Sequence, residues 1–443
     1  MRERPGRRQG GKGRQRQSAE TRKLILSAAA RQFRDKGYAA STLKEIGAAA
    51  GIEAASLYYY FESKEDILED VLDLGFRQAL EVVSAIYRDC VARRAGFRET
   101  FRAMIHAHLR CILIEGDFAA ASMRNFSTLP GAVRIRHRPS FHAYGDLWLA
   151  LLTNARESSD VRDDIDLSSL QRLIVGALNW TVEWFDAKNY SLSDFSEKTA
   201  GLLLDGMLYP TADPARWKDM PALVDPVLRN ERGRTKAERT RAHIIFSAAR
   251  VLCDRGYEES TLRQIAERAG LEAGSLYYHF SSKEEIIDAV LAQGLREITD
   301  GVGAILESDT GFPDHGSRLA AGIRSHMLYL YTHDEFVSTN IRIYGQLPRD
   351  ISLRQRPVRQ EYAAVWERSL RRAQAAGELR AELEVVPLRQ LMLGALNWTV
   401  LWFDPERKKT QNFKTLDELI GVQRALFLEG IVARRLAGLP EKQ

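Results

Sequence analysis

One helix-turn-helix pattern occurs twice in this chain, 219 residues apart. Residues 21–64 align with residues 240–283 without a gap, and 24 of the 44 positions are identical. The segment 176–182, Gly-Ala-Leu-Asn-Trp-Thr-Val, returns unchanged at 394–400. The repeat therefore extends well beyond the helix-turn-helix pattern, and the chain must fold as two related units.

Composition favours helices in both units. Hydrophobic residues make up 45% of the 443 residues, which is enough to build real cores. Only 13 prolines interrupt long stretches rich in Ala, Leu, Glu and Arg. We predict an all-α fold of two tandem units, each an N-terminal three-helix helix-turn-helix domain followed by a larger helical domain.

Proline and charge mark the ends of these domains. The segment between the units contains Pro210, Pro214, Pro221 and Pro226, which do not fit helix interiors, so we interpret it as a linker. The first 17 residues hold seven Lys or Arg against one Glu, which suits either an arm that contacts phosphates or a solubilising tail. The predicted boundaries are 1–17 for this disordered basic arm, 18–65 and 236–284 for the helix-turn-helix domains, 66–208 and 285–438 for the helical domains, and 209–235 for the linker.

Neither a disulfide nor a membrane anchor is expected. Cys90, Cys111 and Cys253 fall at unrelated places in the two copies, so we interpret them as free thiols in a reducing cytoplasm. No run approaches the roughly 18 apolar residues of a membrane span, and no apolar segment follows the basic N-terminus as in a secretion signal. We expect a cytoplasmic protein without a membrane partner.

Nothing in the repeat suggests an enzyme, a metal or a cofactor. His106, His108, His137 and His326 have no Cys or carboxylate partners at metal-ligand spacing. No nucleophile, base and orienting group recur together at matched positions, and no glycine-rich phosphate loop is present. We therefore expect a binding protein with no cofactor.

The helix-turn-helix segments carry their own start signals. Thr-Leu-Lys-Glu at 42–45 and Thr-Leu-Arg-Gln at 261–264 are capping boxes, in which the Thr hydroxyl and the side chain three residues on satisfy free N–H groups. Each capping box starts a second helix. A short third helix is expected over 54–60 and over 273–279.

The third helix should present a surface to DNA. Leu57 and Phe61 are four residues apart and share its inner face, so the small and weakly charged residues around them point outward. A major groove accepts short side chains at a helix start, and Lys44 and Arg263 on the second helix suit guanine N7 and O6. Polar residues near helix starts suit phosphate oxygens. The predicted DNA contacts are Thr42, Lys44, Ala54, Ala55, Ser56, Tyr58, Tyr59, Tyr60 and Lys64 in the first copy, and Thr261, Arg263, Ala273, Gly274, Ser275, Tyr277, Tyr278, His279 and Lys283 in the second.

A competing interpretation makes these tyrosines core aromatics and these lysines ordinary solvated charges. The recurrence of the whole set in both copies favours DNA binding. The set also resembles the DNA-binding signature of the tetracycline-repressor-like (TetR) family, through Thr-Leu-Lys-Glu-Ile, Ala-Gly-Ile, Ser-Leu-Tyr-Tyr-Tyr-Phe and Ser-Lys-Glu in the first copy, and Thr-Leu-Arg-Gln-Ile-Ala and Ser-Leu-Tyr-Tyr-His-Phe-Ser-Ser-Lys-Glu in the second. Tyr60 departs from the pattern, since the family more often has His there, as at His279.

The resemblance implies a dimeric repressor whose helical regulatory domain binds a small ligand and then releases its operator. In the family the last two helices of each unit pair across the dimer. Segments 173–185 and 192–208, like 391–403 and 416–431, have apolar faces that suit such pairing. With two units in one chain, we expect the pairing within one molecule, and recognition helices about 34–36 Å apart.

Aromatic residues repeat in the helical domains where a ligand would bind. Tyr144 and Trp148 return as Tyr362 and Trp366, and their spacing of four places them on one helix face. Apolar walls with an Asn, a Tyr hydroxyl and a nearby Arg suit an apolar ligand with a polar or anionic head, although core packing would use the same aromatics. The predicted ligand contacts are Arg124, Tyr144, Trp148, Asn179, Trp180, Trp184, Arg342, Tyr362, Trp366, Asn397, Trp398 and Trp402.

Three functional hypotheses follow from these patterns. The Leu-Asn-Trp-Thr-x-x-Trp run is similar to a stretch in TetR-type regulators of fatty-acid and steroid catabolism, whose ligands are acyl-CoA thioesters. The leading hypothesis is a sequence-specific transcriptional repressor that a small hydrophobic effector, with acyl-CoA as a candidate, releases from double-stranded operator DNA. Matching positions of the two copies differ: Lys44 corresponds to Arg263, and Tyr60 corresponds to His279. The two half-sites need not be identical, so we expect the operator to be an imperfect palindrome. A homodimer of tandem chains or an activator, and a protein-binding adaptor that no longer contacts DNA, are the alternatives.

Overall fold

The computed structural model describes residues 10–126, 131–206, 235–332, 336–343, 346–405 and 415–430, and these residues form helices joined by turns. The first unit contains α1 (Gly10–Lys36), α2 (Leu43–Ala50), α3 (Ala54–Leu57), α4 (Lys64–Ala92), α5 (Phe97–Arg110), η1 (Cys111–Glu115), α6 (Asp117–Phe126), α7 (Gly131–Glu157), α8 (Leu167–Asn179), η2 (Trp180–Glu183) and α9 (Leu192–Asp205). The second contains α10 (Lys236–Arg255), α11 (Leu262–Arg268), α12 (Ala273–Leu276), α13 (Lys283–Leu306), α14 (His315–Tyr331), α15 (Phe336–Ile343), α16 (Arg349–Ala375), α17 (Val385–Trp398), η4 (Thr399–Leu401), α18 (Leu416–Arg424) and η5 (Ala425–Glu429). The prediction of an all-α fold in two tandem units is confirmed.

Both capping boxes form as predicted. The Thr42 hydroxyl accepts a hydrogen bond from the Glu45 N–H, and the Glu45 carboxylate accepts from the Thr42 N–H. Thr261 and Gln264 repeat the arrangement at the start of α11. These reciprocal bonds satisfy N–H groups that have no partner inside the helix, which is why α2 and α11 begin where they do.

The basic arm differs from the prediction. Helix α1 begins at Gly10, so residues 10–17 are helical and the expectation of disorder was wrong for this part. Arg16 forms an ion pair with Glu20 one turn later, at 3.4 Å, and the Thr21 hydroxyl donates to the Gln17 carbonyl. Arg, Lys and Gln are good helix formers, so a polar segment continues a helix that a packed segment has started. Residues 1–9 of the arm, nearly all of the linker, and the end of the last domain lie outside the described residues.

The third helix of each unit is shorter than predicted. Helices α3 and α12 end at Leu57 and Leu276, whereas the expectation extended them to residues 60 and 279. The chain continues through tighter turns, in which the Tyr60 N–H donates to the Leu57 carbonyl at 2.9 Å. Leu57 and Phe61 are nonetheless both buried, as the spacing of four predicted.

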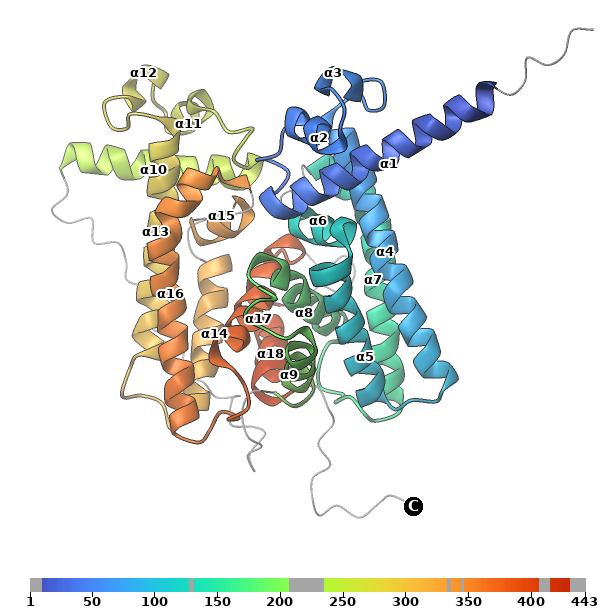
Figure 1. Ribbon diagram of the computed structural model, residues 1–443. Coiled ribbons are helices and arrows are strands. Elements are labelled where there is room, and N and C mark those ends of the chain that lie inside the picture. Colours follow the sequence, from blue (N-terminus) through green and yellow to red (C-terminus); the bar gives the residue numbers. More distant parts are fainter. Residues whose placement is uncertain are drawn as a thin grey trace, which may run out of the picture.

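Each unit places its helix-turn-helix domain, which we call its head, on top of the longer helices. Figure 1 shows both heads, α1–α3 and α10–α12, on the same side of the molecule. In the first unit α4 runs from the head into the regulatory domain and packs on α5, α6 and α7. In the second unit α13 makes the matching contacts with α14, α15 and α16.

The two regulatory domains contact each other through α8 and α17, with α9, α18 and η5 alongside them (Figure 1). Gly176 of α8 lies against the Trp398 ring, and Gly394 of α17 lies against the Trp180 ring. A Cβ atom at either glycine would come within 2.5 Å of the facing indole, so only glycine permits this approach. The exchange of a glycine and a tryptophan in both directions gives the contact an approximate two-fold symmetry.

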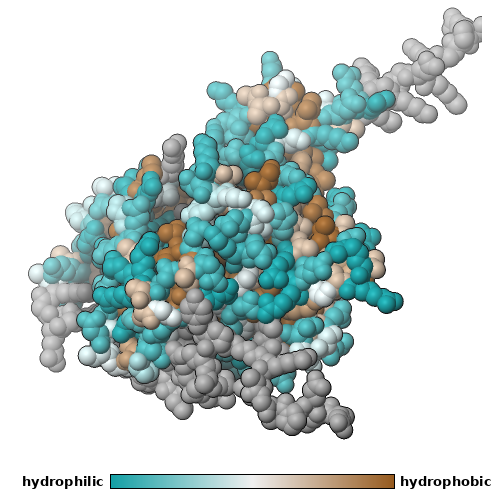
Figure 2. Space-filling model, turned by 60° about the horizontal axis from the view of Figure 1, so that its bottom comes forward, coloured by the Kyte–Doolittle hydropathy of each residue, from teal (hydrophilic) through white to brown (hydrophobic). Residues whose placement is uncertain are grey.

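A single apolar core continues through this contact. It includes Ile174 and Leu178 of the first unit together with Met392 and Leu396 of the second, all buried. The second head has a separate cluster, which α15 and the start of α16 complete. On the side away from the heads, apolar residues show as small patches separated by hydrophilic ones (Figure 2). None of the described helices is long and apolar enough to cross a bilayer.

Candidate nucleic-acid interface and ligand cavity

Both heads expose a pair of tyrosines. Tyr58 and Tyr59 are 63% and 80% exposed, and Tyr277 and Tyr278 are 61% and 89% exposed. Burying a large aromatic side chain is favourable, so a core aromatic would not be left in this state. The interpretation of these tyrosines as core residues is therefore excluded, and each head presents them at the end of α3 or α12.

Small residues precede the tyrosines in each head. Ala55 and Ser56 of α3 are exposed, as are Ala273 and Gly274 of α12. The side chains of Ala54 and Ser275 are half-buried. Short side chains leave the backbone close to any surface that docks here, as a helix in a major groove requires.

The second helix of each head presents a basic residue to solvent. Lys44 and Arg263 are exposed, near the exposed capping threonines Thr42 and Thr261. Gly51 closes α2 in the left-handed region, at φ 73°, which turns the chain from α2 into α3. This turn sets the angle between the second and third helices, and so decides which residues share one surface.

Lys64 and Lys283 have partners inside their own heads. The Lys64 ammonium donates to the carbonyls of Tyr38 and Ser41, both at 3.0 Å, and lies 4.1 Å from the Tyr38 ring centroid. Lys283 donates to the Tyr257 carbonyl at 2.7 Å, and burial lowers the pKa of both lysines. These contacts tie the start of α4 or α13 to the turn after the first helix. An ammonium has three hydrogens, and the bonds named here do not use all of them, so each lysine can still donate to a phosphate. That contact stays a prediction.

The two remaining predicted contacts, Tyr60 and His279, occupy matched positions just before Phe61 and Phe280. Both are half-buried, and the Tyr60 ring packs edge-on against Tyr59 with centroids 5.0 Å apart. Each is therefore held by its own head while part of its side chain faces outward.

A cavity of about 570 Å³ opens in the second regulatory domain. Its walls include Tyr362 and Asn397, two of the predicted ligand residues. Two more, Trp180 and Trp184, belong to the first unit and close the cavity from across the contact between the units. The volume lies within the range of about 300–1,000 Å³ found for small-molecule sites. The structure thus brings four of the predicted ligand residues together around one space.

Three other predicted ligand residues, Arg124, Asn179 and Trp398, line a small hollow of about 30 Å³ between the units. Trp180 and Asn397 line this hollow as well as the large cavity. The hollow holds a water molecule or two but no organic effector.

The aromatic pairs Tyr144 with Trp148 and Tyr362 with Trp366 lie mainly in the cores. Trp148 and Trp366 have no exposed surface, and Tyr144 is 1% exposed. Of these four, only Tyr362 also lines the 570 Å³ cavity. Core packing, the competing interpretation of these aromatics, therefore accounts for the other three.

Trp184 packs edge-on against Phe195 in an aromatic cluster with Phe185 and Tyr190. Trp402 of the second unit has the Arg172 guanidinium 5.0 Å from its ring centroid. The last predicted ligand residue, Arg342, is half-buried on α15. Its guanidinium interacts electrostatically with the Tyr331 hydroxyl.

A buried histidine in each regulatory domain escaped the sequence analysis, which considered it only as a metal ligand. His326 Nδ1 lies 2.6 Å from the Tyr362 hydroxyl, and His326 Nε2 lies 3.0 Å from Asn397 Oδ1. The neutral ring satisfies both bonds when the tyrosine donates to Nδ1 and Nε2–H donates to the amide. Burial lowers the pKa of His326 to about 4, so the ring is neutral.

The first unit repeats only half of this arrangement. His108 Nδ1 contacts the Tyr144 hydroxyl, but His108 Nε2 and the Asn179 amide are buried and have no hydrogen-bond partner among the residues that the structure describes. Burial lowers the pKa of His108 to about 3. A matched spacing of His, Tyr and Asn between the two copies was the signal that would have found this network.

Charged residues of the cavity were also missed. Arg356, Arg359 and Arg389 line it from the second unit, and Glu183 lines it from the first. The repeated run Arg-x-Arg-Pro at 136–139 and 354–357 pointed to Arg356. Each of the other three has a different residue at the matching position of the other copy, so a comparison of the repeats does not reveal them.

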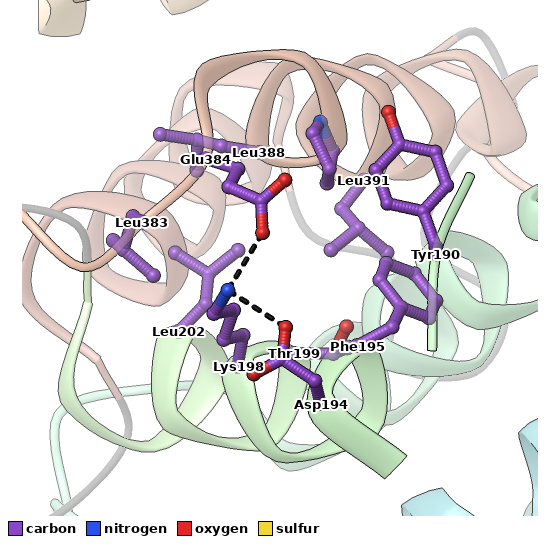
Figure 3. A pocket seen from close by; sticks show the side chains of 11 residues that line it. Tyr190, Asp194, Phe195, Lys198, Thr199, Leu202, Leu383, Glu384, Leu388 and Leu391 are labelled. Carbon is purple, nitrogen blue, oxygen red and sulfur yellow. Dashed lines mark hydrogen bonds and ion pairs between the residues drawn. The ribbon is translucent and has the colours of Figure 1, made fainter. Parts of the chain in front are cut away.

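A further hollow, of about 20 Å³, lies between α9 and the start of α17 (Figure 3). Lys198 of α9 reaches across it and pairs with Glu384 at 2.6 Å, while Asp194 holds the same ammonium at 2.7 Å. The space accommodates about one water molecule. Its residues therefore hold the two units together and do not form an effector site.

Among the described residues, no group of three or more His, Cys, Asp or Glu side chains has the arrangement to hold a metal ion. Cys90 and Cys111 are buried and Cys253 is half-buried, and none of the three forms a disulfide with another described residue.

Comparison with known proteins gives two family matches, and each occurs twice. "Bacterial regulatory proteins, tetR family" matches residues 25–71 and 244–290. "Tetracyclin repressor-like, C-terminal domain" matches residues 95–207 and 313–411. Together these matches cover more than half of the chain and follow the two units seen in the structure.

Individual relatives each resemble one unit's length of the chain. The HTH-type transcriptional repressor KstR2 of Rhodococcus jostii is 25% identical over 42% of this chain and 90% of its own length. The fatty acid metabolism regulator protein of Bacillus subtilis is 24% identical over 41% of this chain and 93% of its own length. The crystal structure of FadR from Bacillus subtilis in complex with stearoyl-CoA overlaps 41% of this chain and 96% of its own, with 21% identity and a TM-score of 0.36.

Proposed function

The chain belongs to the TetR family of bacterial regulatory proteins, as a tandem of two units, and we propose that it is a repressor whose two heads grip one operator together. The observation that carries this proposal is the duplicated surface of the heads. Exposed tyrosines, short side chains and one basic residue occur in the same arrangement on α2–α3 and α11–α12, on one side of the molecule (Figure 1).

We propose further that the chain acts as its own dimer. Reciprocal packing of Gly176 on Trp398 and of Gly394 on Trp180 supports pairing within the molecule. Ion pairs of Lys198 with Glu384 and of Arg162 with Glu429, both at 2.6 Å, add to the same contact. Light scattering tests this proposal: one chain of 50.1 kDa per particle agrees with it, and a stable pair of chains contradicts it.

The proposed effector is a small hydrophobic molecule with a polar or anionic head, and an acyl-CoA is one candidate. The 570 Å³ cavity combines apolar walls such as Leu295 and Leu393 with the basic Arg356 and Arg359. A relative in Bacillus subtilis is named for the regulation of fatty acid metabolism, which supports a lipid-derived effector. Effector binding must favour a spacing of the heads that does not fit DNA, with a coupling free energy of about 1–3 kcal/mol.

Selection of bound duplexes from random DNA tests the proposed function. We expect two half-sites that are related but not identical, and an affinity that falls steeply with salt. A chain without salt-dependent affinity for any duplex would instead support the adaptor hypothesis. Reporter expression with and without the gene for this protein then separates repression from activation.

A further inference from the structure

The effector cavity is built from both units, and its first-unit wall carries a charge. Glu183, at the end of η2, is the one acidic residue among the described residues that line the cavity. Its side chain is 17% exposed, and it interacts electrostatically with Arg359 of α16 and Arg124 of α6. Burial raises the pKa of Glu183, while both arginines favour its charged form. A carboxylate of the first unit thus lines the same cavity as Arg359 of the second unit and acts electrostatically on it.

Glu183 also connects the cavity to the first head, through Arg124. Arg124 Nε lies 3.4 Å from the Glu183 carboxylate. The same guanidinium donates from Nη1 to the carbonyls of Arg34 and Asp35, in the last turn of α1. Arg124 therefore joins the cavity wall to the end of the first helix of the first head.

This charge arrangement exists once in the chain. The position that matches Glu183 in the second unit is Leu401, since Asn179-Trp180 aligns with Asn397-Trp398. The positions that match Arg359 and Arg389 in the first unit are Phe141 and Gln171. The two units therefore differ at the residues that would recognise a charged ligand.

An anion entering this cavity must compete with Glu183. Arg389 already pairs with Glu367 at 3.1 Å and is 10% exposed, so it is engaged within its own unit. Arg356 is exposed and Arg359 half-buried, and their positive charge attracts an anion into the space that Glu183 borders. Two anions at one guanidinium in a partly desolvated site repel each other strongly.

We propose that this cavity is the single effector site of the chain, that it takes an amphipathic organic anion, and that Glu183 is the resident counter-ion which the anion displaces from Arg359. Displacement leaves Glu183 and Arg124 free to shift, and with them the end of α1. The inference rests on the proposed function, because it assigns the site and mode of action of the effector of that repressor. Fatty acids and acyl-CoA thioesters both combine an anionic head with an apolar chain, and the experiment distinguishes them.

Calorimetric titration of the full chain with palmitate, palmitoyl-CoA and CoA tests the proposal. We expect one palmitate or palmitoyl-CoA per chain and no binding of CoA alone. Replacing Arg359 by Phe, its counterpart in the first unit, or by Gln should weaken binding by at least about tenfold. Glu183→Gln should strengthen binding by about fivefold or more, because the competing carboxylate is gone. Glu197→Gln, which removes a partner of Arg102 on the surface of α9, is the matched control.

The proposal is overturned by two ligands per chain, by unchanged affinity in both Arg359 variants, or by unchanged or weaker binding in Glu183→Gln. Failure of both acyl probes to bind would also overturn it, because the ligand class would then be wrong. Circular dichroism of each variant verifies folding. Affinity for the selected operator without ligand is measured in parallel, so that a chain which binds DNA but fails these tests refutes only this inference. Loss of DNA binding in the unaltered chain refutes the proposed function itself.

Discussion

At the scale of single residues, the buried histidines make stability depend on pH. Burial lowers the pKa of His326 from 6.5 to about 4 and that of His108 from 6.5 to about 3. Below pH 6.5 the unfolded chain gains protons on both rings while the folded chain does not. The free energy of unfolding therefore falls as the pH drops from 6.5 toward 4.

We expect each buried histidine to cost about 2 kcal/mol of stability at pH 5 relative to pH 8. Urea unfolding of the full chain at pH 8, 6 and 5 measures this effect. His326→Gln lowers stability at pH 8, since Tyr362 and Asn397 lose a partner, but should reduce the further loss toward pH 5 by about 2 kcal/mol. A pH profile that keeps its full slope in this variant would show that His326 is protonated in the folded chain.

The exposed basic residues of the heads should determine base preference on one side each. Lys44→Ala should cost about 1–3 kcal/mol at one half-site, and Arg263→Ala should do the same at the other. Binding to duplexes that vary one half-site at a time separates the two effects. Arg88→Ala, at an exposed position near the far end of α4, is the control. An equal loss across all sequences would mean that Lys44 and Arg263 contact phosphates and do not read bases.

At the scale of helices, the contact of α8 with α17 depends on two glycines that the repeat preserves. A Cβ at Gly176 would lie 2.5 Å from Cγ of Trp398, whereas one at Gly421 of α18 would meet nothing within 4 Å. Gly176→Ala should lower the free energy of unfolding by about 1–3 kcal/mol, as overpacking does. Gly421→Ala should raise it by about 0.5–1 kcal/mol, because only helix propensity changes. Chemical unfolding of both variants checks the pair, and equal effects would place the α8–α17 contact elsewhere.

The helices of the heads were predictable because their signals are local. Capping boxes at Thr42 and Thr261 and the spacing of Leu57 and Phe61 each act within one turn of helix. The length of α3 was overestimated, since the tighter turns after Leu57 depend on packing against the other two helices. The helical state of residues 10–17 was missed, because composition alone does not show that a neighbouring packed helix extends into a polar segment.

The cavity that we propose as the effector site was only partly predictable. Tyr362, Asn397, Trp180 and Trp184 were found because they repeat. The charged residues Glu183 and Arg359 were missed because they do not repeat, and because they line one cavity only through the contact of the two units. Such a contact joins residues more than 170 positions apart, and no local pattern in the sequence encodes it.

At the scale of the whole molecule, the proposed pairing within one chain would replace the association of two chains. Separate subunits must find each other before they bind a palindrome, so their apparent affinity depends on concentration. Here the second head is held beside the first by α8 and α17 and by a covalent connection. Operator binding by this chain should therefore follow a simple one-to-one isotherm, with no loss of affinity on dilution below the concentrations at which ordinary dimers dissociate.

The proposed pairing of the heads also limits the operator. If α3 and α12 both read DNA from one side of the molecule, we expect them to reach successive major grooves on one face of a duplex, about one helical turn apart. Inserting about 5 base pairs between the selected half-sites turns one of them to the opposite face, and we expect affinity to fall toward that of a single half-site. Inserting about 10 base pairs restores the face but doubles the separation, so it should not restore affinity, because the packed contact of α8 with α17 does not stretch. Mobility-shift titrations of the three duplexes measure this directly. Full affinity for the 10-base-pair insertion would mean that the heads separate on DNA and that the covalent linker, without the α8–α17 contact, holds the pair together.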